Sequence, residues 1–147
     1  MKKQVFITVM TALLLGCSGT TKNIDSNDIK YSEAKNYYFR NDAVAPSSPK
    51  ITSQEQFDEL FGAAPVMGTD GEPTQIDFTK QFVIATILPE TDCPTEIIPR
   101  TLKTSGDSLI FTYKANRREK STFTMRPIYL LIVDKNNDRH TTIVKEE

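Results

Sequence analysis

The chain has 147 residues, about the length of one small domain, and its 18 basic and 19 acidic side chains give a formal net charge of −1. This balance excludes the clustered basic excess of nucleic-acid-binding domains. With one histidine and two cysteines, and no glycine-rich phosphate-binding motif, the sequence predicts neither a His/Cys zinc site nor a cofactor. We therefore do not expect an enzyme.

The chain begins with an export signal. Lys2 and Lys3 precede an apolar run over residues 5–15, a pattern typical of secretory signals, and the run is shorter than the roughly 20 residues that span a bilayer. The stretch LLGC, residues 14–17, resembles the lipobox of bacterial lipoproteins. That resemblance implies that residues 1–16 are removed and that Cys17 becomes the acylated first residue, a membrane anchor. The alternative is a plain secretory signal with an unmodified Cys17.

Residues 17–35 predict a flexible tether. Their composition is polar and shows no repeating apolar period. Such a segment does not bury enough apolar surface to offset the entropy of ordering it. We expect residues 36–147 to form the single folded domain.

The domain is predicted to begin with a strand at residues 36–39 and to continue with a helix over about residues 53–61. Ser53 is a suitable helix N-cap, and Gln56 three residues later completes a capping box. Gly62 follows at a position typical of a helix end. Apolar residues at i, i+3 and i+4 form a single stripe that packs on something else. The stripe consists of Phe57, Leu60 and Phe61.

The second half of the chain reads as closely spaced strands. Residues 64–75 are rich in Gly and Pro and predict a long loop, and the strands follow at 82–88, 95–103, 108–113, 121–125, 128–133 and 141–144. The turn-forming residues 135–138 between the last two strands predict a hairpin. The sequence thus predicts a mostly β fold, either a small antiparallel β-barrel or a strongly curved sheet, with one short α-helix.

A proline-rich loop follows the most apolar of these strands. Pro89, Pro94 and Pro99 each fix a φ angle and favour an extended residue before them, so we expect a stiff, strand-like protrusion. A loop that is already ordered loses less entropy when it binds, and an extended loop suits a peptidase cleft. The candidate inhibitory residues are Pro89, Glu90, Thr91, Asp92, Cys93, Pro94, Thr95 and Glu96.

Cys93 is the one cysteine outside the first twenty residues, and three interpretations stay open. It can be a small buried hydrophobe that is chemically inert. It can be presented to a partner, as a ligand to a metallopeptidase zinc or as a group that fills a specificity pocket. It can also pair with the cysteine of another chain. The neighbouring acids disfavour a thiolate, so low intrinsic reactivity is expected.

Charged residues elsewhere offer weaker candidates. Arg117, Arg118 and Lys120 lie at a predicted hairpin tip and are either solvated or a rim that steers an acidic partner. The acidic residues at 70, 72 and 77 lack the spacing of a calcium loop and are read as solvated loop charge. His140 lies beside a turn and is interpreted as an exposed strand residue rather than as part of a catalytic triad.

The order of elements resembles the C-terminal domain of PrcB-type protease-complex subunits. The resemblance covers most of residues 50–135 and departs at ETDCPTE, residues 90–96, where that family has a glycine-rich turn. The lipobox, polar tether and small β domain also resemble the potempins, outer-membrane lipoproteins of Bacteroidetes that inhibit the organism's own secreted peptidases through loops on small β-barrels. The segments that carry the first resemblance are ITSQEQFDELFG (51–62), IDF (76–78), FVIATIL (82–88), TLKTSGDSLIFTY (101–113) and RPIYLLIVDK (126–135).

Both resemblances imply a connection with peptidases. The leading hypothesis is an outer-membrane lipoprotein that inhibits a secreted peptidase by inserting the 89–99 loop into its cleft, without a cofactor or a metal of its own. The first alternative is a non-inhibitory interaction subunit of a surface or periplasmic complex. The second is a small-ligand carrier that uses the mouth of a barrel.

Overall fold

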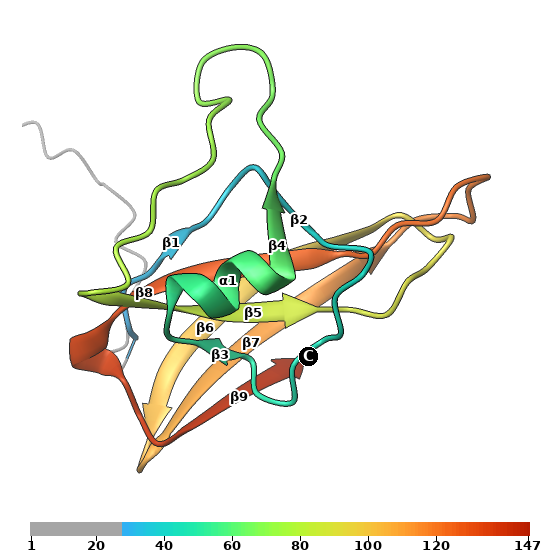
Figure 1. The fold of residues 1–147 in the computed structure, drawn as a ribbon. Helices are drawn as coiled ribbons and strands as arrows, with labels where there is room; N and C mark the ends of the chain where they lie inside the picture. Colours follow the sequence, from blue (N-terminus) through green and yellow to red (C-terminus); the bar gives the residue numbers. More distant parts are fainter. Residues whose placement is uncertain (1–27) are drawn as a thin grey trace, which may run out of the picture.

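The computed structural model describes residues 28–147, which form a three-layered, mostly β domain with one short helix (Figure 1). The predicted fold class is confirmed as a mostly β chain with curved sheets; no closed barrel forms among the described residues. The elements in chain order are β1 (Ser32–Glu33), β2 (Tyr37–Phe39), β3 (Lys50–Ile51), α1 (Gln54–Leu60), β4 (Phe61–Ala63), β5 (Gln81–Ile87), β6 (Thr95–Ser105), β7 (Ser108–Arg117), β8 (Ile128–Asp134), η1 (Lys135–Asn137) and β9 (Thr141–Glu146).

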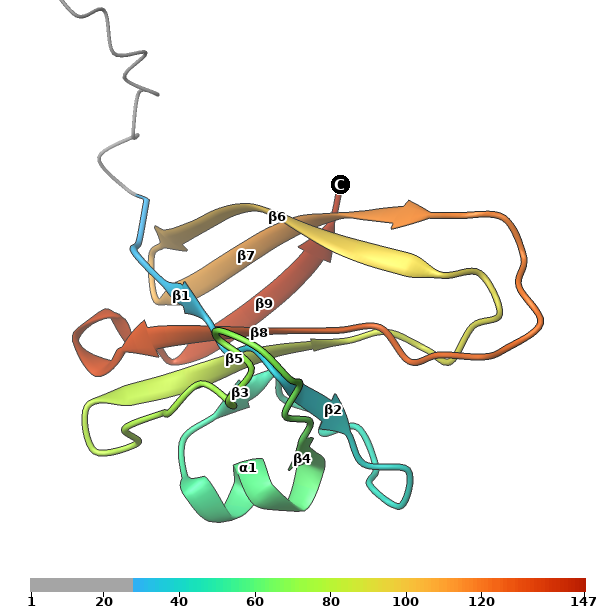
Figure 2. The ribbon, with the colours of Figure 1, turned by 90° about the horizontal axis from the view of Figure 1, so that it is seen from above.

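The middle layer is an antiparallel sheet with strand order β1-β8-β5-β3. Figure 2 shows it between the layer of α1, β2 and β4 on one side and the layer of β6, β7 and β9 on the other. Alternate residues of β5 therefore enter different cores. Val83 and Ala85 point into the first core, against the helix layer. Phe82 and Ile84 point into the second core, against the second sheet, which consists of β6, β7 and β9. A strand that is buried on both faces needs a continuous apolar run, which explains the sequence FVIATI.

The helix forms where the sequence predicts it. The Ser53 hydroxyl accepts a hydrogen bond from the Gln56 backbone N–H at 3.2 Å, and the Gln56 side chain accepts one from the Thr52 N–H at 3.2 Å. Phe57 on the inner face is 1% exposed. The helix ends at Leu60 with Phe61 as its C-cap, next to the Gly62 that predicted its end. Gly62 itself lies in β4, where a Cβ atom would come within 2.4 Å of the Tyr38 ring. Gly62 makes room for that ring and does not cap the helix.

The last strand does not pair as predicted. After β8, the 3₁₀ turn η1 carries the chain out of the middle sheet, and β9 pairs in parallel with β7. Val144 then packs against the second core. The expected hairpin between residues 128–133 and 141–144 is therefore wrong, because adding β9 to the second sheet covers that core. The predicted strand at 121–125 does not form either; only Met125 makes a β-bridge.

The folded domain begins earlier than predicted. Residues 28–35 were expected in the tether, but Asp28 bridges to Lys103 in β6, and β1 pairs with β8. Ala34 is 6% exposed, so this short segment gains enough contacts to be ordered. The leader and Cys17 lie outside the described residues. Among residues 28–147, no helix is both long and apolar enough to cross a bilayer.

Candidate functional site: two projecting loops

The 89–96 segment belongs to a two-loop structure, here called the arm, made of residues 88–94 and 118–127. Thr91 and Met125 exchange backbone hydrogen bonds of 2.9 Å in both directions. The Ser121 N–H donates to the Asp92 carbonyl at 2.7 Å, and the Arg118 N–H donates to the Pro94 carbonyl at 2.9 Å. Figure 1 shows the two loops side by side at one end of the domain. The loop is therefore held by its neighbour as well as by its prolines.

Cys93 is half-buried within the arm. Its N–H donates to the Thr91 hydroxyl at 3.1 Å, its thiol donates to an Asp92 carboxylate oxygen at 3.6 Å, and its carbonyl accepts from the Thr95 hydroxyl at 2.7 Å. Thr95 is buried, and both Thr95 and Glu96 belong to strand β6. The thiol is therefore neither sealed in the core nor presented at a tip.

The eight residues predicted to form the inhibitory loop differ in their exposure to solvent. Pro89 and Glu90 are exposed, residues 91–94 are half-buried, Thr95 is buried and Glu96 is exposed on its strand. The Glu90 carboxylate also accepts a hydrogen bond from the Thr124 hydroxyl at 2.7 Å. Within this segment, the side chains that project into solvent are therefore those of Pro89 and Glu90 at its start and of Glu96 on β6.

The basic residues predicted as a separate contact lie at the same end of the domain. Arg117 makes a bidentate pair with Glu146, at 2.6 and 2.9 Å, and this hydrogen-bonded pair raises the pKa of Arg117 and lowers that of Glu146. Lys120 lies 2.6 Å from the Asp92 carboxylate. Arg118 is exposed and makes no ion pair within residues 28–147. Of the three cations, Arg118 is the one left to attract an acidic partner.

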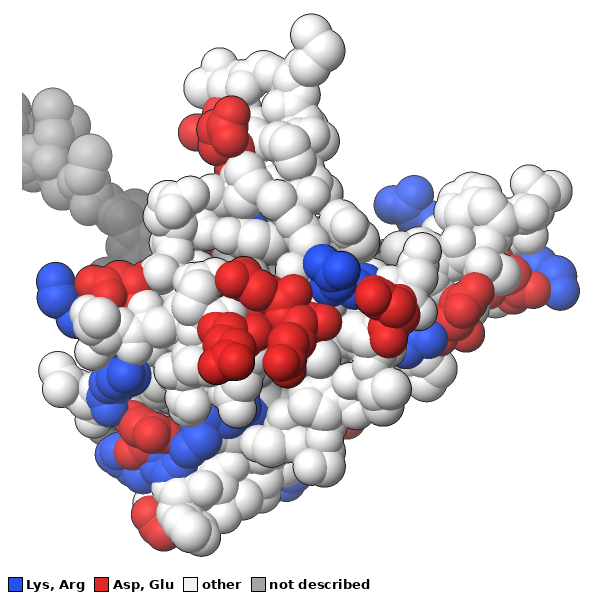
Figure 3. Space-filling model, in the orientation of Figure 1, with Lys and Arg blue, Asp and Glu red and all other residues white. Residues whose placement is uncertain are grey.

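A second projection, the 64–75 loop, rises from the end of β4. Met67 is fully exposed at 102% and Val66 is 61% exposed, so two apolar side chains stand at its apex. Figure 3 shows this loop standing clear of the body, with acidic atoms on one side of its upper part, while an acidic patch covers α1 below it. An apolar side chain held away from the core adds nothing to the stability of the isolated domain.

Hydrogen bonds fix the shape of the 64–75 loop. The Val66 N–H donates to the Gly71 carbonyl at 2.9 Å, closing the apex into a tight turn. Below it, the Asn36 side-chain amide donates to the carbonyls of Asp70 and Glu72, at 2.8 and 2.9 Å. Asn36 can do this because its backbone has a φ of 63°, a conformation that Asn tolerates better than most residues. The apex is therefore ordered before any partner arrives.

Close approach of the backbone requires a glycine at position 71 of this turn. A Cβ atom on Gly71 would lie 1.8 Å from the Val66 carbonyl oxygen, much closer than any real contact. The turn sequence that predicted a loop here thus also determines how tightly the loop closes. Sequence reasoning missed Met67, and the available signal was an adjacent apolar pair in an otherwise Gly- and Pro-rich stretch.

The remaining candidates offer no chemistry. His140 is exposed. Asp77 accepts hydrogen bonds from the backbone and hydroxyl of Thr79, which lower its pKa, and Lys80 lies 3.6 Å away. Within residues 28–147, no three His, Cys, Asp or Glu side chains are grouped so as to hold a metal ion. The candidate site therefore consists of the arm and the 64–75 loop, and not of a cluster of reactive side chains.

The comparisons with known proteins do not assign the chain to a family. No family model, no curated protein and no solved structure matches the chain. The resemblances to PrcB-type subunits and to potempins stay predictions.

Proposed function

We propose that this chain is a lipid-anchored protein that inhibits a secreted peptidase by inserting the 64–75 loop, with Met67 in an apolar specificity pocket. The observation that carries the proposal is the fully exposed Met67 on a turn that Asn36 holds in shape. The anchor is the acylated Cys17, and the outer membrane is the proposed location.

The energetics favour this loop for insertion. Ordering a side chain on binding costs about 0.5 to 1.5 kcal/mol, and a loop that is already braced avoids part of that loss. Methionine is unbranched and polarisable, so it fills irregular apolar pockets well. The 89–96 segment is the second candidate, because only Pro89, Glu90 and Glu96 are exposed in it and its centre is hydrogen-bonded to the facing loop.

The test is to titrate the mature chain without its acylated first residue, Ser18 to Glu147, against secreted metallo, serine and cysteine peptidases. Stoichiometric inhibition of one class is the expected result. Met67→Ala is expected to raise the inhibition constant at least about tenfold, the effect of losing one interface hot spot. Val44→Ala is the matched control, since Val44 is 84% exposed but lies in another loop.

Variants of the arm test the second candidate. Cys93→Ser removes the thiol with little change in volume, and Glu90→Gln removes an exposed charge. If these variants weaken inhibition and Met67→Ala does not, the inserted element is the arm. If a peptidase co-purifies with the protein and keeps its full activity, the chain is a non-inhibitory subunit. If no peptidase of any class is bound or inhibited, the proposal fails.

A further inference from the structure

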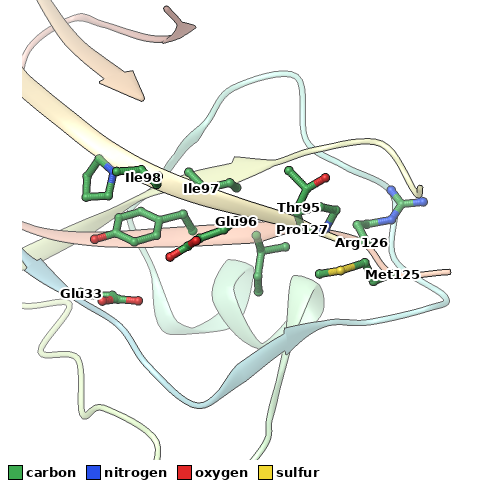
Figure 4. Close-up of a pocket in the computed structure, with 11 residues that line it drawn as sticks. Glu33, Thr95, Glu96, Ile97, Ile98, Met125, Arg126 and Pro127 are labelled. Carbon is green, nitrogen blue, oxygen red and sulfur yellow. The ribbon is translucent and has the colours of Figure 1, made fainter. Parts of the chain in front are cut away.

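A groove opens between the second sheet and the middle sheet, on the side away from β9. Its volume is about 540 Å³, and its walls come from the first half of β6 and from the segment that enters β8. Figure 4 shows residues of both walls, with Glu33 of β1 and Glu96 of β6 among the side chains that line it. The floor includes Ile128 and Tyr129 of β8.

The β6 wall of this groove is an open strand edge. The Arg118 N–H donates to the Pro94 carbonyl, so the alternate residues Glu96 and Ile98 pair with β7, while Thr95, Ile97 and Pro99 face outward. Pro99 fits this pattern because a proline has no N–H to lose at an open edge. No described strand pairs with this stretch. It offers the N–H groups of Thr95 and Ile97, and the carbonyls of those residues and Pro99.

The chain's own N-terminal segment already adds to the neighbouring parts of both edges. The Ile29 N–H donates to the Leu102 carbonyl of β6 at 2.8 Å, and the Ala34 N–H donates to the Leu130 carbonyl of β8 at 2.9 Å. The described segment then turns away into β2. The half of the groove nearer the arm therefore keeps the geometry that accepts a strand, with no described strand in it.

Two of the side chains around the groove carry negative charge, which favours a basic partner. Glu33 and Glu96 are exposed, and neither carboxylate makes an ion pair with any residue from 28 to 147. Two unpaired carboxylates beside an open strand edge complement a basic side chain on an added strand. The half-buried side chains of Ile128 and Tyr129 below them suit an apolar neighbour.

We infer that residues Thr95–Pro99 of β6 accept an extended segment of a partner protein by strand addition, with a lysine or arginine of that segment between Glu33 and Glu96. Main-chain hydrogen bonds supply affinity in this binding mode, and the side-chain contacts supply selectivity. This surface is independent of Met67, so its failure and that of the proposed inhibitory loop can be told apart.

The first experiment measures residue-level amide hydrogen exchange by NMR on the mature chain. In the free protein, we expect fast exchange at Thr95 and Ile97 and slow exchange at Glu96 and Ile98. The probe is an acetylated five-residue peptide of alternating lysine and valine. At saturation it should slow exchange at Thr95 and Ile97 at least about tenfold, since new strand hydrogen bonds must open before exchange. Protection of these two amides in the free protein would overturn the inference, because the chain would already fill its own edge.

The second experiment measures peptide affinity by fluorescence anisotropy. The variant Glu33→Gln with Glu96→Gln should bind about fivefold more weakly, the effect of losing two partly exposed ion pairs. The matched control is Glu55→Gln with Glu59→Gln on α1, which should bind as the unaltered protein does. Met67→Ala should also leave the affinity unchanged. Equal binding of the counterpart peptide with glutamate in place of lysine, or no loss of affinity on N-methylation of its backbone, would contradict the inference.

Discussion

The side chain of Asn36 is predicted to set the stability of the 64–75 loop, and two substitutions separate its two contributions. Asn36→Gly removes the hydrogen bonds to Asp70 and Glu72 but keeps a backbone that accepts a φ of 63°. Two exposed hydrogen bonds are together worth about 1 to 2 kcal/mol. Asn36→Ala loses the same bonds and adds about 1 kcal/mol, because a Cβ-bearing residue without a polar side chain is disfavoured at positive φ. We therefore expect losses of about 1 to 2 kcal/mol for Gly and about 2 to 3 kcal/mol for Ala.

Urea unfolding of the mature chain measures these free energies, and the slope of the transition should stay the same for all three proteins. Amide exchange at Gly71 is the local readout, since the loop should open more often in both variants. An equal loss for Gly and Ala would refute the backbone argument. A loss below about 0.5 kcal/mol for both variants, within the range of ordinary surface substitutions, would show that Asn36 does not hold the loop.

Three other predictions concern the body of the domain. Leu131 is fully buried, so Leu131→Ala should lower the free energy of unfolding by about 2 to 5 kcal/mol in the same urea assay. Burial, with a smaller effect of Glu33, raises the pKa of Tyr129 to about 12. Because the unfolded chain loses this proton near pH 10 and the folded chain only near pH 12, the free energy of unfolding should fall as the pH rises between these values. Thermal melts of Tyr129→Phe should show a smaller fall over the same pH range. The hydrogen bond from Arg117 lowers the pKa of Glu146 below its usual 4.5, so the pair stabilises the fold above that pH and the gain disappears as the pH falls through the lowered pKa. Glu146→Gln should flatten this acid limb, and an unchanged limb would assign it to other carboxylates.

The parts of the fold that depend on neighbouring residues could be predicted from the sequence. Ser53, Gln56 and Phe57 lie within one helical turn or two, and their cap and apolar face were visible in the sequence. The strands β5 and β8 were equally visible, because burial on both faces requires unbroken apolar runs.

Contacts between distant residues could not be predicted in the same way. The periodicity of residues 141–144 indicates a strand but does not indicate a partner, and β9 pairs with β7 rather than with the preceding β8. The strand β1 has only two residues, too few to show a period. The joining of residues 88–94 to 118–127 depends on hydrogen bonds between loops about thirty positions apart in the chain, and no local pattern reports these.

The way the chain enters the domain has a mechanical consequence. Residues 28–34 cross from the edge of β6 to the edge of β8. They are held at β6 by the β-bridge and ion pair of Asp28 with Lys103 and by the backbone hydrogen bond of Ile29, and at β8 by the short strand β1. Tension applied at the N-terminus would load these bonds one after another, as in peeling, rather than together. Release of the strip would also withdraw Ala34 from the first core and Ile29 and Tyr31 from the surface of the second. It would lengthen the link to any anchor and bare a further stretch of both strand edges.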